Sequence, residues 1–393
     1  MPTVMISCGE LSGDIYAGAL AGELRRLRPG IRIIGLGGDR LREAGAELVG
    51  DYHGLAVTGL VEALEVLPRA WTLHRALVRR AAAERPDALV VIDFADFNFR
   101  LARALHRIGV PVIYYVCPQV WAWRPGRLQV LKRILDRALV IFPFEEAIYR
   151  EAGIPVEFVG HPLLDLAEPS AGREALLSSW GLAAEAPTIA LLPGSRPNEL
   201  RAMLPVIAAA VPIVASRLPR AQFVVARAPD LPDALFQPLL DQDRHRIVGV
   251  VGRANDVLTA ADVVVTASGT ATVQTAIHER PMVIVYRLAP ITYWLGKRLV
   301  KVDSFGMPNL VAGRRIVPEL LQGAFTPEAV AAETLRYFED REYADRTRAA
   351  LRDVRHRLGA GGASRRAAEQ VLAVCDAGGA ARPPGTAAPE NAR

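Results

Sequence analysis

The sequence predicts an α/β protein built from two doubly wound parallel sheets, with a helical C-terminus. Short runs of Val, Ile and Leu alternate with amphipathic helical stretches, which is typical of parallel strands buried on both faces. The alternation breaks at a polar stretch near residues 165–175 and then starts again. The chain has 393 residues, which is long for a single hydrophobic core.

The first half contains six apolar runs that predict strands, at residues 3–8, 31–36, 87–93, 110–116, 137–142 and 156–160. Between them, helical patterns cover residues 12–27, 60–84 and 145–153. The second half contains five further runs, at residues 186–195, 221–227, 245–252, 261–268 and 281–287. From about residue 327 the pattern is helical.

These patterns divide the chain into two Rossmann-like domains, residues 1–167 and 168–375, the second carrying the terminal helices. Residues 376–393 are rich in Pro, Gly and Ala, so we expect a disordered tail.

The composition argues against several classes of protein. Three scattered cysteines form no CxxC pair and no His/Cys cluster, so the sequence predicts neither a disulfide framework nor a metal site. The N-terminus shows no cleavable leader, and we find no uninterrupted apolar run of the roughly 18 residues that span a membrane. We therefore expect a soluble protein in a reducing cytoplasm, able to lie on a membrane surface.

The stretch "MISCGELSGDIYAGAL" resembles the strand, loop and helix of nucleotide-binding folds. Gly9 and Gly13 tighten the loop, but it also carries Glu10 and Asp14. It is not a GxGxxG loop, and Glu10 would repel a pyrophosphate, so a dinucleotide-dependent dehydrogenase is disfavoured. We expect Glu10 to accept hydrogen bonds from sugar hydroxyls and Asp14 to stabilise the start of its own helix.

Two loops in the second half predict an anion site. In "LLPGSRPNE" a strand ends at Gly194, Ser195 can cap the following helix, and Arg196 can donate to a phosphate. In "TASGTATVQ" a strand runs into Ser268–Thr270, where Gly269 lets a phosphate approach a helix N-terminus. Gln274, four residues further on, could reach a ribose hydroxyl. The sequence therefore predicts a diphosphate clamp in this half.

The stretch "VVIDFADFNFR" ends a predicted buried strand with Asp93, which could act as a general base, while Asp96 is expected to cap the next helix. Trp121 and Trp123 can be core anchors or an apolar wall. Residues 286–314 mix aromatic and basic side chains, as does the predicted helix at 60–84. Both can lie on a membrane interface or be ordinary surface helices. His161 is expected to be structural.

Ten segments occur in the order found in lipid-A-disaccharide synthases, a family that the chain resembles from about residue 4 to residue 325. They are GELSGD, GLGG, IDFADFN, YVCPQVWAWR, FPFE, FVGHPL, LLPGSRPNE, SGTATVQ, KRLVKVD and MPNLVAGRRIVPELLQ. Any one of these segments is a weak signal, whereas all of them in order are specific.

The resemblance implies an inverting GT-B glycosyltransferase, whose two Rossmann-like domains face each other across a cleft. It implies UDP-2,3-diacylglucosamine as donor, 2,3-diacylglucosamine 1-phosphate as acceptor, and a β-1′,6-linked disaccharide and UDP as products. No metal or other cofactor and no nucleic acid is implied. The lipid substrates imply work at the inner face of the cytoplasmic membrane, with the first domain on the acceptor and membrane side. A second copy of the chain is a candidate partner.

Carried over residue by residue, the resemblance makes Asp93 the base that takes the proton of the acceptor 6-hydroxyl, with Glu10 near the reacting sugars. Arg196 and the loop Ser268–Thr270 would hold the diphosphate, and Asn309 would lie near the donor. Gln274 stands where the family usually has Glu and can still donate to or accept from a ribose hydroxyl.

Two other functions remain open at this point. A related GT-B enzyme could use another UDP-sugar, such as one with non-acylated N-acetylglucosamine, and would not need membrane-facing segments. A catalytically silent protein could bind a nucleotide sugar without transferring it. Asp93, Arg196 and Asn309 argue against the silent protein.

Overall fold

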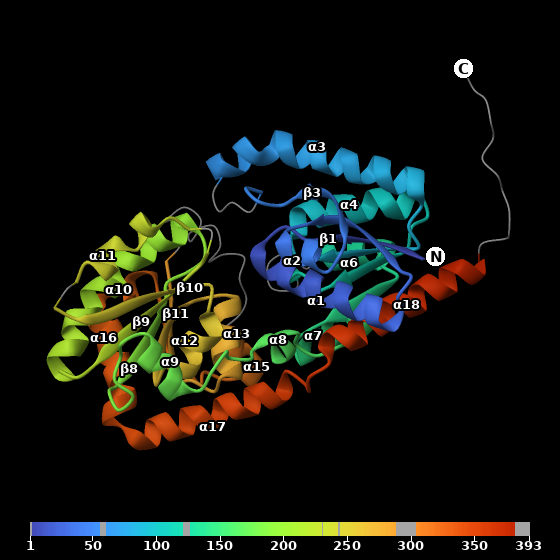
Figure 1. The fold of residues 1–393 in the computed structure, drawn as a ribbon. Coiled ribbons are helices and arrows are strands. Elements are labelled where there is room, and N and C mark those ends of the chain that lie inside the picture. The colour runs from blue at the N-terminus through green and yellow to red at the C-terminus, as the bar shows by residue number, and fades with distance from the viewer. Residues whose placement is uncertain are drawn as a thin grey trace. The chain divides into compact units, whose positions relative to one another are not determined.

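The computed structural model describes residues 2–55, 60–120, 126–229, 231–242, 244–287 and 304–381 (Figure 1). The chain divides into two units. The first comprises Met1–Pro162 and Gly362–Arg393, and the second comprises Leu163–Gly361. Because each unit has its own sheet, each is described by itself.

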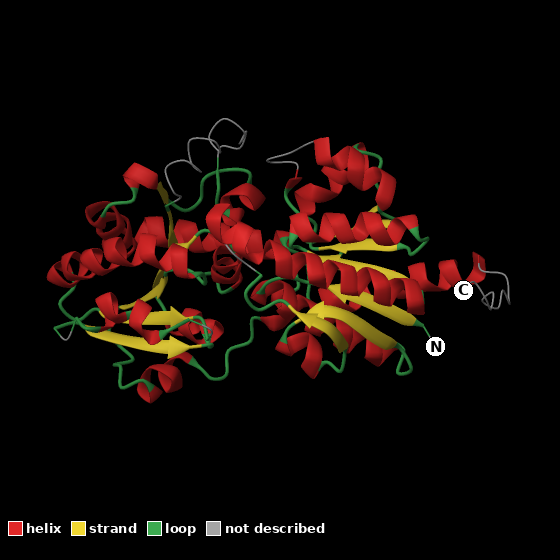
Figure 2. Ribbon diagram, turned by 90° about the horizontal axis from the view of Figure 1, so that it is seen from above, coloured by secondary structure: helices red, strands yellow, loops and turns green. Residues whose placement is uncertain are grey.

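The sheet of the first unit has seven strands in the order β3-β2-β1-β4-β5-β6-β7, and all neighbouring pairs are parallel. The strands are β1 Thr3–Ser7, β2 Arg32–Gly37, β3 Glu47–Asp51, β4 Ala88–Ile92, β5 Val112–Tyr115, β6 Arg137–Val140 and β7 Val156–Phe158. Helices cover both faces of the strands (Figure 2). Two-sided cover explains why the central strand β4 is buried at all five positions and reads as a continuous apolar run.

The helices of the first unit are α1 Leu11–Leu27, α2 Asp39–Glu43, α3 Leu60–Glu84, α4 Ala95–Arg107, α6 Gly126–Ile134, α7 Pro143–Glu151 and α18 Ala363–Ala381. Helices α1 and α18 pack side by side on one face of the sheet, and α3 packs on α4 on the other (Figure 1).

Helix α18 differs from the prediction in two ways. It belongs to the first unit, although we expected the terminal helices in the second domain. It also continues to Ala381, past residue 375, where we expected disorder to begin. Its packing on α1 supplies the reason, since the Arg28 guanidinium holds the Asp376 carboxylate at 2.7 and 2.9 Å. Sequence pattern alone does not show which sheet a terminal helix covers.

The sheet of the second unit has six parallel strands in the order β10-β9-β8-β11-β12-β13. The strands are β8 Thr188–Leu192, β9 Gln222–Arg227, β10 Arg246–Val251, β11 Val263–Ala267, β12 Met282–Tyr286 and β13 Glu319–Leu321. The α-helices are α8 Leu163–Leu166, α9 Arg173–Ser179, α10 Pro197–Arg217, α11 Gln237–Leu240, α12 Ala254–Ala260, α13 Thr270–Ile277, α15 Met307–Ala312, α16 Pro327–Glu339 and α17 Arg341–Arg357. Two short 3-10 helices are η1 Asp233–Leu235 and η2 Gln322–Ala324.

Among the described helices, α10 is long and apolar enough to cross a membrane by length and composition. Its apolar face is part of the core of the second unit, and the helix packs on α16. A core helix of this kind passes the same test as a membrane span.

Both sheets reverse their strand order at one place. In the first sheet the chain moves outward from β1 in one direction and from β4 in the other, and β8 and β11 form the equivalent pair in the second sheet. In open parallel sheets, ligands bind outside the carboxyl ends of the strands at such a switch point. Apart from Asn309, which lies in α15 after β12, the predicted site residues follow these four strands.

Candidate active site

The switch point of the first unit brings Glu10 and Asp93 to the same sheet edge. Strands β1 and β4 are neighbours in parallel register, with Ser7 opposite Val91. Glu10 comes three residues after Ser7, and Asp93 comes two residues after Val91. The predicted pair of carboxylates is therefore placed together by the sheet.

Asp93 has an unusual backbone conformation. Its φ is 43°, and that of Phe94 is 48°, so two successive side-chain-bearing residues lie in the left-handed region. The structure holds them there by hydrogen bonds. The Asp93 N–H donates to Val116 O at 3.3 Å, and the Asp93 carbonyl accepts from the Tyr114 hydroxyl at 2.8 Å and from Asn98 Nδ2 at 2.9 Å. Such strain is typical of functional sites, and here hydrogen bonds hold the backbone that carries the carboxylate.

Asn98 connects the ends of β1 and β4 and was not singled out from the sequence. Its side chain is fully buried. Its Nδ2 donates to the carbonyls of Ser7 (3.2 Å), Ile92 (3.1 Å) and Asp93 (2.9 Å), and its Oδ1 accepts from the Ser7 hydroxyl at 2.7 Å. A polar residue on the inner face of the amphipathic helix α4 is the sequence signal that could have found it.

Gly9 lets the first loop approach the second. A Cβ built on Gly9 would lie 2.1 Å from the Phe94 ring, a distance that real Cβ atoms do not tolerate. Only glycine therefore allows the loop after β1 to lie against the residue that follows Asp93.

Tyr16 of α1 lies near enough to both carboxylates for their charges to affect its pKa. Burial raises the pKa of its phenol, and the nearby Tyr115, Asp93 and Glu10 raise it further. Tyr16 therefore stays protonated beside them. The Glu10 carboxylate itself accepts from the Ser12 hydroxyl at 2.9 Å. This edge of the sheet thus carries two carboxylates close to Tyr16.

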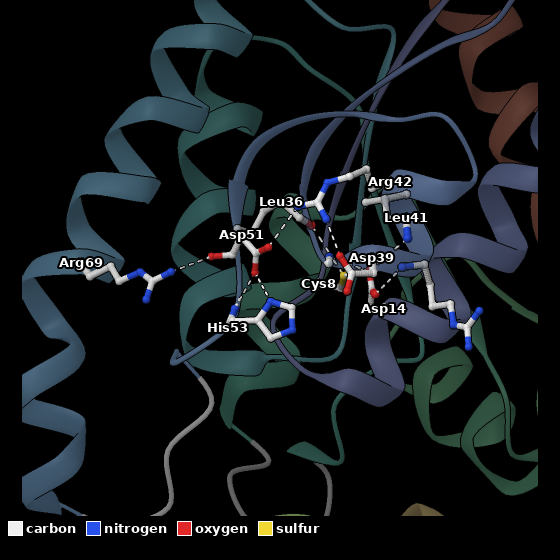
Figure 3. Close-up of polar contacts among 11 residues, drawn as sticks. Cys8, Asp14, Leu36, Asp39, Leu41, Arg42, Asp51, His53 and Arg69 are labelled. Carbon is white, nitrogen blue, oxygen red and sulfur yellow. Dashed lines mark hydrogen bonds and ion pairs between the residues drawn. The ribbon is translucent and has the colours of Figure 1, made fainter. Parts of the chain in front are cut away.

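Asp14 has a role different from the predicted one. Its buried carboxylate accepts from the backbone N–H groups of Gly38 (2.7 Å), Arg40 (2.9 Å) and Leu41 (3.3 Å) (Figure 3). It therefore caps α2, the next helix along the chain, rather than its own helix. Nearby, the Asp51 carboxylate at the end of β3 binds Arg42 (Figure 3). The contacts of Asp14 tie the first turn of α1 to the start of α2.

In the second unit, the loop Gly194–Arg196 follows β8. Gly194 has φ 127°, which favours glycine. Arg196, not Ser195, is the N-cap residue of α10, so the predicted cap by Ser195 is wrong. The Glu199 carboxylate takes its place, since it accepts from Ser195 N at 3.3 Å and from Arg196 Nη1 at 3.1 Å. Glu199 thus orients the guanidinium that we expected to bind phosphate.

The loop Ser268–Thr270 follows β11, the neighbour of β8. Gly269 is the N-cap of α13 with φ 139°, and a Cβ there would meet no atom within 4 Å. The first backbone N–H groups of a helix lack partners within it and attract anions. Tyr286 ends the adjacent strand β12, and burial raises the pKa of its phenol. The charge of Glu199 raises this pKa further and that of Arg196 lowers it, so Arg196 also lies near this edge of the sheet. Arg196 and the start of α13 are therefore placed at one switch point.

Gln274 and Asn309 both form hydrogen bonds to other parts of the protein. Gln274 Nε2 donates to Asn255 Oδ1 at 2.5 Å. Asn309 is buried, donates to Val317 O and to Glu319, and accepts from the N–H groups of Ile316 and Val317. Both donors and both lone pairs of the Asn309 amide are thus used, so any effect on a donor sugar passes through the loop that it holds.

The other predicted features have different outcomes. Trp121, Trp123 and the aromatic and basic residues 288–303 lie outside the described residues. His161 is buried against Tyr16 and Phe142, as expected of a structural residue. Cys8 and Cys117 are buried, and burial raises the pKa of both thiols. Within the ranges that the structure describes, no group of three His, Cys, Asp or Glu side chains could hold a metal.

Solved structures share this architecture. The chain superposes on the UDP-GlcNAc 2-epimerase from Neisseria meningitidis bound to UDP-GlcNAc with a TM-score of 0.66 at 13% identity, covering 94% of this chain and 99% of that one. For the calicheamicin glycosyltransferase the TM-score is 0.61 at 18% identity, covering 96% and 98%. At such identities the likeness shows the fold, which is GT-B.

Sequence comparison is more specific. A family profile described as lipid-A-disaccharide synthetase matches residues 4–374. The lipid-A-disaccharide synthase of Geobacter sulfurreducens is 44% identical over 373 residues, covering 94% of this chain and 96% of the relative. That of Myxococcus xanthus is 41% identical over 377 residues, covering 96% and 98%. With two parallel sheets and site residues at both switch points, the chain belongs to the lipid-A-disaccharide synthase family and is a glycosyltransferase of the GT-B fold.

Proposed function

We propose that this chain transfers the sugar of UDP-2,3-diacylglucosamine to the 6-hydroxyl of 2,3-diacylglucosamine 1-phosphate, with inversion at the anomeric carbon. The observation that carries the proposal is Asp93, held in a left-handed conformation beside Glu10 at the switch point of the first sheet. A carboxylate on a strained backbone that hydrogen bonds hold in place suits a general base.

The proposed step has three parts. The acceptor hydroxyl oxygen forms a bond to the anomeric carbon, and the Asp93 carboxylate takes the hydroxyl proton. The bond from that carbon to the diphosphate oxygen breaks, and the electron pair leaves with UDP. Arg196 and the first N–H groups of α13 stabilise the charge that develops on UDP, while Glu10 accepts hydrogen bonds from a sugar. In this proposal the first unit supplies the residues that act on the acceptor, and the second unit supplies those that hold the UDP of the donor.

The test is a transfer assay with both lipids, followed by UDP release and by detection of the disaccharide. Asp93→Asn should lower turnover about 100- to 10,000-fold, the usual contribution of a general base, while circular dichroism stays unchanged. Normal turnover of this variant would show that Asp93 is not the general base. Equal turnover of non-acylated UDP-N-acetylglucosamine would favour the alternative transferase, and UDP binding with no UDP release would favour a silent binding protein.

We also propose that the protein works at the inner face of the cytoplasmic membrane. On α3, Leu67 and Trp71 are 48% and 55% exposed, and the Arg75 guanidinium lies 3.4 Å from the centre of the Trp71 ring. Exposed aromatic and basic groups on one helix suit an anionic lipid interface. Trp71→Ser should reduce sedimentation with anionic vesicles. Val251→Ser, at an equally exposed apolar residue of the second unit, is the matched control and should bind as the unmodified chain does.

A further inference from the structure

A cavity of about 230 Å³ on the first unit is used by neither part of the proposed reaction site. Helices α4 and α6 form it. Its lining consists of Asp96, Phe99, Arg100, Arg103, Arg127 and Val130. Three of these six side chains are guanidinium groups and one is a carboxylate, so the lining carries a net charge of 3 − 1 = +2. A positively charged cavity of this size indicates a small anionic ligand.

One of its arginines is held in place before any ligand arrives. Arg127 Nη2 lies 2.5 Å from the Asp96 carboxylate, and the guanidinium carbon lies 5.0 Å from the centre of the Phe99 ring. Phe99 is buried and cannot move away easily. Because the Arg127 side chain is already ordered, binding through it loses little conformational entropy.

The other two arginines are exposed on α4, one turn apart. Within the part of the chain that the structure describes, neither Arg100 nor Arg103 forms an ion pair, whereas arginines such as Arg32 in the same unit do. Like charges at this spacing destabilise a helix, and an anion in the cavity would relieve the repulsion. The Asp96 side chain is 79% exposed, so solvent screens its repulsion of an anion.

The chemistry of the lining selects a phosphate monoester. Guanidinium groups donate two parallel hydrogen bonds to phosphate oxygens, which ammonium groups do not. A phosphate monoester carries nearly two negative charges at neutral pH, which balances the +2 of the lining.

We propose that this cavity binds the phosphate monoester of the acceptor lipid. Asp96 follows Asp93 by three residues, and Arg100 lies five residues into α4, about 7.5 Å along the helix axis. That length is comparable to one hexose with its substituents, so a sugar with its hydroxyl at Asp93 can present its phosphate to the cavity. The assignment rests on the proposed function, because only that function supplies a sugar 1-phosphate.

The first experiment measures binding without transfer. The full-length protein is saturated with UDP, which occupies the donor site, and is titrated with glucosamine 1-phosphate and, as the matched ligand, glucosamine. We expect binding of the phosphate compound alone and a loss of about 10- to 100-fold in affinity in Arg100→Ala/Arg103→Ala. Arg107→Ala, one turn further along α4 and outside the lining, should bind like the unmodified chain. Equal affinity in all three proteins overturns the proposal, whatever the transfer assay shows.

The second experiment measures transfer to acceptor lipid dispersed in detergent. In the double variant, the KM for the acceptor should rise about 10- to 100-fold with kcat nearly unchanged. With an acceptor that lacks the 1-phosphate, the double variant and the unmodified chain should have the same KM. An equal rise for both acceptors would show that the cavity does not contact the phosphate. Sedimentation with phosphatidylglycerol vesicles is measured for the same double variant. If it binds these vesicles less well but keeps the KM for the acceptor, the anion in the cavity is a membrane headgroup and the acceptor assignment is overturned.

Discussion

The hydrogen bonds of Asn98 make a quantitative prediction about the base. Asn98→Ala removes one bond accepted from Ser7 and the two N–H groups that serve three carbonyls. All lie in the interior, where a hydrogen bond contributes about 1 kcal/mol and an unsatisfied group costs about 1–3 kcal/mol. Since Tyr114 still donates to the Asp93 carbonyl, we expect the free energy of unfolding of the first unit to fall by about 2–4 kcal/mol.

The same change should lower turnover. The left-handed conformation of Asp93 costs about 1–3 kcal/mol and persists only while its surroundings hold it. Without Asn98, the backbone that carries the carboxylate loses a hydrogen bond, and we expect kcat to fall about 10- to 100-fold.

Ser7→Ala is the matched control, because it removes the hydroxyl that donates to Asn98 Oδ1 but leaves the contact with Asp93. It should cost about 1 kcal/mol of stability and keep turnover near that of the unmodified chain. Hydrogen exchange of the amides of β1 and β4 measures the stability of the first unit separately, which a single unfolding curve of a two-unit protein does not. Equal kcat for Asn98→Ala and Ser7→Ala would refute the reasoning.

Three further predictions concern glycines and one histidine. Gly9→Ala should lower the free energy of unfolding by about 1–3 kcal/mol and also lower turnover, because its Cβ meets the Phe94 ring. Gly22 lies in the middle of α1 with no atom within 4 Å of an added Cβ, so Gly22→Ala should raise the free energy of unfolding by about 0.5–1 kcal/mol. Denaturant titration compares them, and equal shifts would contradict the model of close approach. Gly269→Ala should weaken UDP binding about 5- to 100-fold, because alanine is strained at φ 139° although its Cβ meets no other atom. Calorimetry measures the affinity for UDP, and an unchanged value would argue against the anion site. Burial lowers the pKa of His161 from 6.5 to about 3, so the folded state binds fewer protons between these values. The free energy of unfolding should therefore fall as the pH decreases from 6.5 toward 3. In His161→Gln this dependence should be weaker, and an unchanged dependence would show that another group causes it.

The sequence by itself determined the central strands, the fold class and the family. Strands such as β4 and β11 are covered on both faces, so nearly every position selects an apolar residue and the run is visible without a structure. Of the four edge strands, β7 and β10 were predicted, whereas β3 and β13 were not. An edge position is covered less completely, so it tolerates the mixed sequences ELVGD and ELL, which give no apolar run. Asp93, Glu10, Arg196 and Gly269 could be predicted because they follow predicted strands.

Only the tertiary structure decided which groups hold those residues in place. Asp14 caps the helix after the next strand, and Glu199 rather than Ser195 accepts from the loop before α10. Asn98 joins the ends of β1 and β4 and binds Ser7, from which it is 91 residues away in the chain. Helix α18 returns to the first unit from the other end of the chain. Local sequence shows which residue can donate, accept or turn. The partner of a buried polar group depends on which distant segments the sheet order brings beside it, and that is a property of the folded chain.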